Sequence, residues 1–284
     1  TTLMAIGILK GNPVHEVLHL PFFWMKMLKA NTPSNTPARH VYGDHPRQYY
    51  LFFDPPEDRP RRAPLIVYLH GGGWQFGAPE RFTSNAAVFL ERGYSVVLPS
   101  VRRLPWYDFR HFEADLCAFS HHLGRQLEAS GRTGAPMVLA GMSSGAHLAA
   151  HLTYNPRIRA ALEPRATVSG LILCGAPLDL DRMPNTPVIR WLTGRGNPAL
   201  FRQANPRTHL KGDEQTPVLF IHGTHDGLAP IKSARSFRKA LQLPPEKIKF
   251  HVLEGGTHLD AASWGHSDNA VRRVILQWLK EREG

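Results

Sequence analysis

Cysteine is scarce in this sequence, whose 284 residues include only Cys117 and Cys174. Two cysteines cannot build a disulfide framework, so a hydrophobic core must stabilise the fold. Each of them lies in an apolar or helical pattern, where cysteine behaves as a small buried hydrophobe. Because 42% of the residues are hydrophobic and 20% are charged, the chain can supply such a core and does not belong to the disordered class.

Long apolar runs are also missing. The stretch at residues 3–9 is far shorter than the roughly 20 apolar residues that a membrane-spanning helix needs. No charged segment precedes an apolar core at the start of the chain, so no signal peptide is visible. We therefore expect a chain without a membrane span and, by default, a cytoplasmic location.

Acidic residues are few relative to basic ones, with 23 Asp and Glu against 34 Lys and Arg and a net charge of +11. A basic balance can indicate binding to nucleic acid. Here the basic residues are scattered, apart from one tight cluster at Arg59, Arg61 and Arg62, and no aromatic residues are interleaved with them. The pattern disfavours a nucleic-acid partner and favours the steering of anionic substrates, or solubility.

Strand patterns alternate with helix patterns from residue 49 onward. Apolar strands are predicted at residues 49–53, 65–70, 94–98, 138–140, 168–174, 218–222 and 248–253. Helices are predicted at residues 81–91, 112–127, 144–154, 231–241 and 269–283. This alternation predicts a single α/β domain with a doubly wound, mostly parallel sheet.

Two segments stand outside this alternation. Residues 1–40 carry apolar side chains at helical spacing with Pro21 interrupting, which predicts an arm of one or two amphipathic helices. Residues 175–215 form a Pro-rich insertion with short helical patterns at 188–192 and 199–204. The arm either packs on the domain's own core or serves as a lid or an interfacial segment. We expect both segments to form a small cap on a catalytic domain of residues 41–284.

The pattern Gly-x-Ser-x-Gly at residues 141–145 lies between an apolar strand and an alanine-rich helix. In that context the pattern is typical of a sharp strand-to-helix turn that exposes a nucleophilic serine. Gly141 and Gly145 lack a Cβ atom, so the strand and the helix can approach each other closely. We predict Ser143 as a nucleophile and give Ser144, which is off the centre of the pattern, a backbone role.

Three glycines follow the strand at 65–70, in the sequence His-Gly-Gly-Gly-Trp at residues 70–74. Such a run leaves backbone N–H groups free to face a substrate. Acyl transfer builds negative charge on a carbonyl oxygen and needs donors already in place there. We predict an oxyanion hole from the N–H groups of Gly72, Gly73 and Ser144. A phosphate-binding loop is disfavoured, because the Gly-x-Gly-x-x-Gly spacing and a following lysine are both absent.

Asp226 follows the apolar strand at 218–222, in a loop of the kind where catalytic groups of open α/β sheets gather. A carboxylate there can accept a hydrogen bond from a histidine ring and fix its tautomer. We predict Asp226 as the acid of a catalytic triad. A solvated loop aspartate is the alternative reading, and Asp179 and Asp181 are rival acids.

His258 follows the strand at 248–253, again in a predicted loop. A serine hydroxyl is a poor nucleophile without a base near the working pH, which histidine supplies. The chain has 16 histidines, so chain order decides among them. Serine, then aspartate, then histidine, each after a successive strand, is the order of the α/β-hydrolase arrangement. His251 and His266 are less well placed.

Together these four pieces resemble the α/β-hydrolase superfamily, and more narrowly the esterases of its hormone-sensitive-lipase and feruloyl-esterase-like branch. The resemblance covers the chain from about residue 49 to the C-terminus. It implies a serine carboxylic-ester hydrolase that acts through an acyl-enzyme on small to medium acyl esters, with no metal and no other cofactor. Its expected partner is a small-molecule ester.

The chain departs from the family pattern at three places. Arg102 stands where a tyrosine is usual after the fourth strand, and Met142 and Ser144 replace residues usual in the elbow. The N-terminal arm resembles no segment of the family. The first two departures concern the pocket and leave the predicted triad intact.

Substrate contacts and rival functions follow from the same features. We expect Trp74, Met142 and Trp191 to contact substrate, although large aromatic residues more often belong to the core. An arylformamidase-type amidase of the same fold is the first alternative function. A non-catalytic binding protein of this fold is the second, and the intact triad speaks against it.

Overall fold

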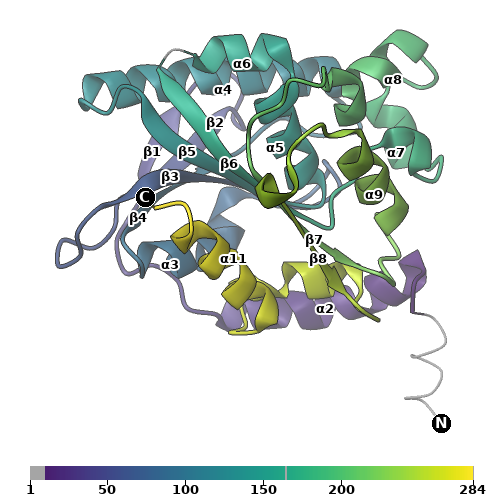
Figure 1. Ribbon diagram of the computed structural model, residues 1–284, viewed down its shortest axis with the longest axis horizontal. Coiled ribbons are helices and arrows are strands. Elements are labelled where there is room, and N and C mark those ends of the chain that lie inside the picture. Colours follow the sequence, from purple (N-terminus) through teal and green to yellow (C-terminus); the bar gives the residue numbers. More distant parts are fainter. Residues whose placement is uncertain (1–9, 164, 284) are drawn as a thin grey trace.

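The computed structural model describes residues 10–163 and 165–283, so the apolar stretch at 3–9 lies outside the described residues. In this part of the chain one sheet of eight strands forms the centre, in the order β1-β2-β4-β3-β5-β6-β7-β8 (Figure 1). The strands are β1 Ala38–Val41, β2 Tyr49–Phe53, β3 Arg62–Leu69, β4 Tyr94–Pro99, β5 Ala135–Met142, β6 Ala166–Cys174, β7 Val218–Gly223 and β8 Ile248–Leu253. Strands β4, β3 and β5 to β8 pair in parallel, whereas β1 and β2 join antiparallel at one edge.

Helices cover both faces of the sheet (Figure 1). One face carries α4 Phe109–Ala129, α5 Ser144–Tyr154, α6 Pro156–Leu162, α7 Pro187–Leu192, α8 Pro198–Ala204 and α9 Ile231–Ala240. The other carries α2 Pro13–Lys29, α3 Thr83–Leu90, α10 His258–Ala262 and α11 Ala270–Lys280. Successive residues of the central strands point to opposite faces, so the central parallel strands are largely apolar on both faces. In β3, Leu65 and Val67 enter one core and Ile66 and Tyr68 the other.

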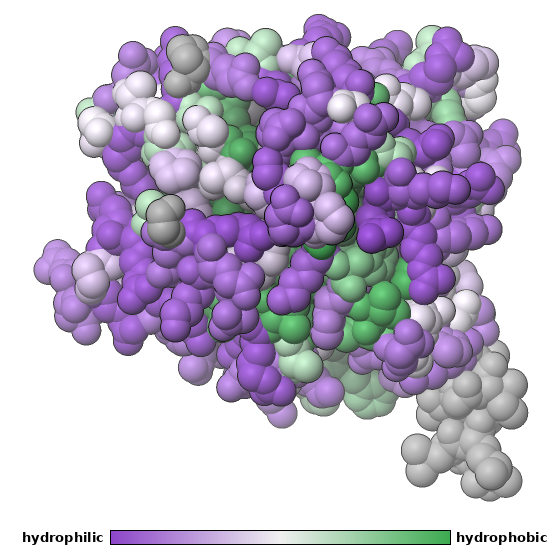
Figure 2. Space-filling view, in the orientation of Figure 1, coloured by the Kyte–Doolittle hydropathy of each residue, from purple (hydrophilic) through white to green (hydrophobic). Residues whose placement is uncertain are grey.

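From residue 10 onward, the described part of the N-terminal segment contains one helix, α2, which continues through Pro21. Beyond the proline, Trp24 lies edge-on against Phe82 with 5.5 Å between ring centroids, and Met27 is buried. These contacts hold the C-terminal turns of the helix in place, and the expected interruption at Pro21 does not occur. The helix rests along the lower edge of the molecule, where Figure 2 shows hydrophobic surface.

Membrane spans were not expected, and within residues 10–163 and 165–283 no helix combines the length and the apolar character that crossing a bilayer requires.

Three further elements differ from the expectations. The short edge strand β1 is largely exposed and gave no apolar run to detect. Helix α6 was not predicted: α5 ends at Tyr154 as expected, but the Asn155 side chain accepts a hydrogen bond from the N–H of Arg157 and caps a new helix that begins at Pro156. His258 was expected in a loop and instead opens α10, capped by Thr257.

The insertion at residues 175–215 contains the two helices that its patterns predicted, α7 and α8. It packs on the α5 face, where the carbonyl oxygen of Ala204 accepts hydrogen bonds from the rings of His147 and His151 at 2.8 and 3.0 Å. The insertion is thereby fixed to the helix that follows the elbow. Its role as a cap stays a prediction.

Candidate active site

Ser143 stands in a sharp turn between β5 and α5, with φ 53° and ψ −121°. A residue other than glycine held in so sparsely populated a region costs about 1–3 kcal/mol, which the surrounding packing must offset. Gly141 and Gly145 permit the turn, because a Cβ atom on either would collide with neighbouring backbone. The Ser143 N–H donates to the carbonyl of Cys174 at 2.8 Å, which ties the elbow to the end of β6.

The glycine-rich loop after β3 lies against this elbow. A Cβ atom on Gly71 would be 3.5 Å from Cβ of Ser143. Gly72 and Gly73 have φ of 132° and 59°, and the Gly72 carbonyl accepts from the N–H of Phe76 at 2.9 Å to close a tight turn. Within the described ranges the N–H groups of Gly72 and Gly73 have no acceptor. The turn therefore leaves free donors in the loop whose first glycine lies against Ser143, and their part in an oxyanion hole stays a prediction.

Asp226 and His258 meet directly. His258 Nδ1 donates to Oδ2 of Asp226 at 2.7 Å, and both residues are buried. The other carboxylate oxygen, Oδ1, accepts from the N–H groups of Leu228 and Ala229 at 2.9 and 2.7 Å. Because Nδ1 of His258 carries the hydrogen of the bond to Asp226, Nε2 is the ring nitrogen left to act as a base.

The electrostatics of this pair suit a base supported by an ionised acid. Burial by itself would raise the pKa of Asp226, but the charge of His258 and hydrogen bonds from His222 and His258 hold it well below its usual range. Burial by itself would lower the pKa of His258. The charge and hydrogen bond of Asp226, together with the charge of Glu16, raise that pKa above the ordinary value. His258 is therefore a stronger base than a free imidazole.

His222 is a second histidine at Asp226 that the sequence patterns did not single out. Its Nε2 lies 3.2 Å from Oδ2 of Asp226 and 2.7 Å from the carbonyl oxygen of Ala229. An atom that faces two acceptors must carry the hydrogen. Because His222 lies inside the apolar strand β7, its pattern is that of an ordinary core position.

Gly175, the residue after β6, joins the pair to the elbow. It has φ 53°, and a Cβ atom there would be 3.1 Å from two ring atoms of His258 and 3.4 Å from Oδ2 of Asp226. The preceding residue, Cys174, accepts the hydrogen bond from Ser143. The end of β6 thus contacts the elbow through Cys174 and the Asp226–His258 pair through Gly175.

The rival residues lie elsewhere. Asp179 is buried, but its carboxylate faces Ser236 and the guanidinium groups of Arg182 and Arg207. Asp181 is exposed beside it. His251 is half-buried on β8, and His266 packs against Phe23 with 5.3 Å between ring centroids. Within the described chain neither histidine contacts Asp226.

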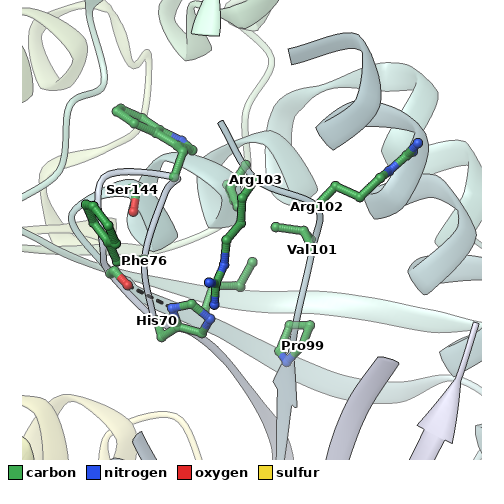
Figure 3. A pocket seen from close by; sticks show the side chains of 11 residues that line it. His70, Phe76, Pro99, Val101, Arg102, Arg103 and Ser144 are labelled. Carbon is green, nitrogen blue, oxygen red and sulfur yellow. Dashed lines mark hydrogen bonds between the residues drawn. The ribbon is translucent and has the colours of Figure 1, made fainter. Parts of the chain in front are cut away.

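A small pocket opens beside the elbow (Figure 3). Gly71, Trp74, Arg103 and Ser144 contribute to its lining. Arg103 extends into it toward His70, whereas Arg102 turns away (Figure 3) and pairs with the buried Asp115 at 2.6 Å. Burial lowers the pKa of His70 to about 4, so this ring is neutral near pH 7.

Of the expected substrate contacts, Trp74 is in this pocket, and its indole N–H donates to Nδ1 of His147 at 3.3 Å. Met142 is buried in the core on the α3 and α11 face of the sheet. Trp191 is half-buried against the opposite core. Neither lines the pocket, so their contact with substrate stays a prediction. Among the described residues no group of three or more His, Cys, Asp or Glu is arranged to hold a metal ion.

The chain is similar to several known proteins. A family model described as BD-FAE matches residues 52–241 of the chain. A kynurenine formamidase from Drosophila melanogaster is 24% identical over 225 residues, which cover 77% of this chain and 73% of that protein. Esterase LipC from Mycobacterium tuberculosis is 25% identical over 267 residues, which cover 86% of this chain and 66% of LipC. The chain spans between 50% and 73% of the length of the curated relatives it matches.

Among solved structures, esterase B from Lactobacillus rhamnosis aligns with a TM-score of 0.74 at 18% identity, covering 95% of this chain and 92% of that one. At this identity the likeness shows the fold. The predicted α/β-hydrolase fold is thus confirmed, as is the predicted resemblance to esterases.

Proposed function

Because the chain belongs to the BD-FAE family, we propose that it is a serine carboxylic-ester hydrolase that acts through an acyl-enzyme. The observation that carries this proposal is the 2.7 Å hydrogen bond between buried Asp226 and His258, beside the strained elbow of Ser143. The relative named as esterase LipC supports the same reaction.

In the first half of the reaction, Oγ of Ser143 attacks the carbonyl carbon of the ester while Nε2 of His258 takes its proton. Ionised Asp226 stabilises the imidazolium that forms. The negative charge on the former carbonyl oxygen is held by the N–H groups of Gly72, Gly73 and Ser144, and one such donor is typically worth about 10²–10³ in rate. The intermediate then collapses. His258 gives its proton to the leaving alcohol, and the acyl group stays on Ser143.

In the second half, His258 removes a proton from a water molecule that attacks the acyl-enzyme carbonyl. The same N–H groups hold the second oxyanion. Collapse of this intermediate breaks the bond to Oγ, releases the carboxylic acid and returns the proton to Ser143. The cycle needs only groups that the chain supplies, together with the ester and water.

Small to medium acyl groups form the proposed substrate class. The pocket beside Ser144 is narrow, and its walls include the side chains of Leu69, Trp74 and Val101. The N-terminal arm and the insertion at 175–215 are proposed as the cap that limits what enters. A series of p-nitrophenyl esters of increasing acyl length tests this, and preference for long chains would contradict it.

The central test is Ser143→Ala, with the exposed Ser130→Ala as its control. Hydrolysis of p-nitrophenyl acetate should vanish in the first variant and persist in the second, with both proteins folded by circular dichroism. Full activity of Ser143→Ala would refute the assignment.

An amidase of the arylformamidase type is the second candidate, because a kynurenine formamidase is among the matched relatives. Turnover of a formylated aromatic amide, compared with turnover of a short ester, separates the two reactions. A binding protein without catalysis is the third reading, and failure of a fluorophosphonate probe to label Ser143 would favour it.

We further propose that α2 binds an anionic lipid surface that carries the ester substrate. Six large apolar side chains on this helix are 47% to 81% exposed, namely Val14, Val17, Leu18, Phe22, Met25 and Leu28. Lys26 and Lys29 in its last turn complement anionic headgroups, as does the net charge of +11.

Sedimentation with phosphatidylglycerol vesicles tests this part of the proposal. The double variant Leu18→Ser with Phe22→Ser should lose binding, whereas Val41→Ser, equally apolar and exposed on β1, should retain it. Binding that is unchanged in the double variant would refute the proposal, as would a concentration-dependent dimer through this face. A cytoplasmic location remains a prediction, to be checked by cell fractionation.

A further inference from the structure

Glu16 is a buried carboxylate on α2 that the reaction above does not use. Its exposed fraction is 0%, and it forms no ion pair with a lysine or arginine of the described chain. A buried charge of this kind is costly unless hydrogen bonds compensate it. Backbone N–H groups supply them: Oε1 accepts from His258 at 2.8 Å and from Gly227 at 3.3 Å, and Oε2 accepts from Leu259 at 3.4 Å.

These donors belong to the two loops that carry the catalytic acid and base. Gly227 follows Asp226 in the chain, and His258 is the base itself. One carboxylate therefore binds both loops at the catalytic residues themselves, in addition to the hydrogen bond between the Asp226 and His258 side chains and to backbone contacts earlier in the loops, such as the N–H of His225 to the carbonyl of Gly256 at 2.8 Å.

The segment that leads into α2 packs on the same loops. Lys10 Nζ donates to the carbonyl of Gly255 at 2.6 Å, just before His258. A Cβ atom on Gly227 would collide with the backbone of Asn12, so the two backbones are in close contact. These contacts fix where Glu16 can lie, since Asn12 also caps α2.

We propose that Glu16 is a positioning residue for the ester hydrolysis described above: it fixes the backbone of His258 and of the loop after Asp226, so that the imidazole meets Ser143 in one orientation. The inference rests on the proposed function. It places a determinant of catalysis on a helix that precedes the region matched by the BD-FAE model, residues 52–241.

The main contribution of Glu16 is to fix the orientation of His258. A displacement of about 1 Å at the base can cost roughly 10²-fold in rate. Without the carboxylate, the buried N–H groups of His258 and Gly227 and the half-buried N–H of Leu259 would lack their acceptor, and the start of α10 would shift to reach water or another partner. The Asp226 side chain fixes the ring tautomer, whereas Glu16 binds the backbone N–H of His258 itself.

The second contribution of Glu16 is the effect of its negative charge on the pKa of His258. Burial lowers the pKa of His258, Asp226 raises it, and Glu16 raises it further. The elements packed against His258 carry further charged and titratable groups, namely Lys10, His15 and Glu16 in the N-terminal segment, His222 and Asp226 in β7 and its loop, and Asp260 in α10. Removing the charge of Glu16 should therefore lower the pKa of His258.

The test compares Glu16→Gln and Glu16→Ala with wild type, using a short p-nitrophenyl ester over a range of pH. Glu16→Gln keeps an acceptor oxygen and loses the charge, so the acid limb of kcat/KM should move to lower pH with only a small loss of kcat. Glu16→Ala loses both, so kcat per folded molecule should fall about 10²-fold with KM little changed.

Glu113→Gln is the matched control, because Glu113 is also a buried carboxylate and accepts from Asn155, Arg157 and Gln203 on the α4 face. It should lower the melting temperature without moving the acid limb. If the Glu16 variants only melt earlier, and their acid limb and kcat per folded molecule match wild type, the inference is overturned.

Ser143→Ala, assayed in parallel, distinguishes failure of this inference from failure of the proposed function. An inactive Ser143→Ala with wild-type kinetics for both Glu16 variants would overturn this inference alone. An active Ser143→Ala would overturn the proposed function.

Discussion

Nε2 of His222 lies 3.2 Å from Oδ2 of Asp226, the same oxygen that accepts the hydrogen bond from His258. The acid of the proposed triad is thus held by two imidazoles and by two backbone N–H groups. A carboxylate with this many donors has little freedom to rotate, so the His258 ring that it orients is fixed as well.

Replacing His222 with Phe should therefore weaken both the fold and the site. The variant loses a donor to a charged group, a contact worth about 1.5–3 kcal/mol, and leaves the Ala229 carbonyl without its partner. We expect the free energy of unfolding in urea to fall by about this amount, and kcat to fall with KM unchanged. His251→Phe on the neighbouring strand is the control and should change stability by no more than about 0.5 kcal/mol. Equal stability and equal kcat in both variants would contradict this role for His222.

The pH dependence of hydrolysis should follow His258. The ring must be neutral to take the proton of Ser143, and its pKa is raised above the ordinary 6.5. Activity should therefore increase as pH rises through that higher pKa, so the acid limb of kcat/KM lies above 6.5. A limb at or below the value for free histidine would show that Asp226 does not act on the ring.

Asp226→Asn tests the effect of the acid on the pKa and the tautomer of His258. Removing the negative charge lowers the pKa of His258, so the acid limb should move to lower pH. The amide also favours the wrong tautomer of the ring, which costs about 10⁴-fold in kcat at serine triads of this kind. Stopped assays with p-nitrophenyl acetate measure both effects. Asp181→Asn, at an exposed rival position, should show neither of them.

Gly175→Ala tests the packing of β6 against the base. The new Cβ atom would stand 3.1 Å from the His258 ring, so the ring must shift away from Ser143. We expect kcat to fall by up to about 10²-fold. Gly134→Ala is a matched control, because Gly134 also has a positive φ, 77°, but has no atom within 4 Å of its Cβ position. Its strain should reduce stability alone, and an equal loss of kcat there would refute the steric explanation.

Trp74→Phe tests the wall of the pocket. The indole N–H donates to Nδ1 of His147, whose Nε2 is hydrogen-bonded to the Ala204 carbonyl. Burial lowers the pKa of His147 to about 3, so the ring is neutral and its Nδ1 needs a donor. Losing that donor should cost about 1–3 kcal/mol in thermal or urea unfolding and should widen acyl preference toward longer chains. Trp106→Phe, at an exposed tryptophan, should change neither quantity.

Much of the sheet could be predicted because buried parallel strands are apolar on both faces. Their short apolar runs stand out, and β2, α5 and β8 have the predicted bounds. The edge strand β1 had no such run, since its residues are mostly exposed. The end of α5 at Tyr154 was predicted correctly, but α6 was missed because the same Asn-Pro pair that ends one helix also caps the next.

The triad residues could be proposed because each follows a strand, and parallel strands deliver their C-terminal ends to one edge. Their supports could not. Glu16 and His258 are 242 positions apart, and no local pattern links them. His222 looked like a core residue of β7, and the need for glycine at 175 depends on a ring that arrives from another strand.

The long separation in sequence between Glu16 and His258 determines when the site can form during synthesis. On the ribosome α2 is synthesised long before β8 and the turn that carries His258, at about 5–20 residues per second. Until that turn is made, the nucleophile has no base and the carboxylate of Glu16 lacks two of its three N–H partners. Hydrolysis can therefore begin only after translation has passed His258.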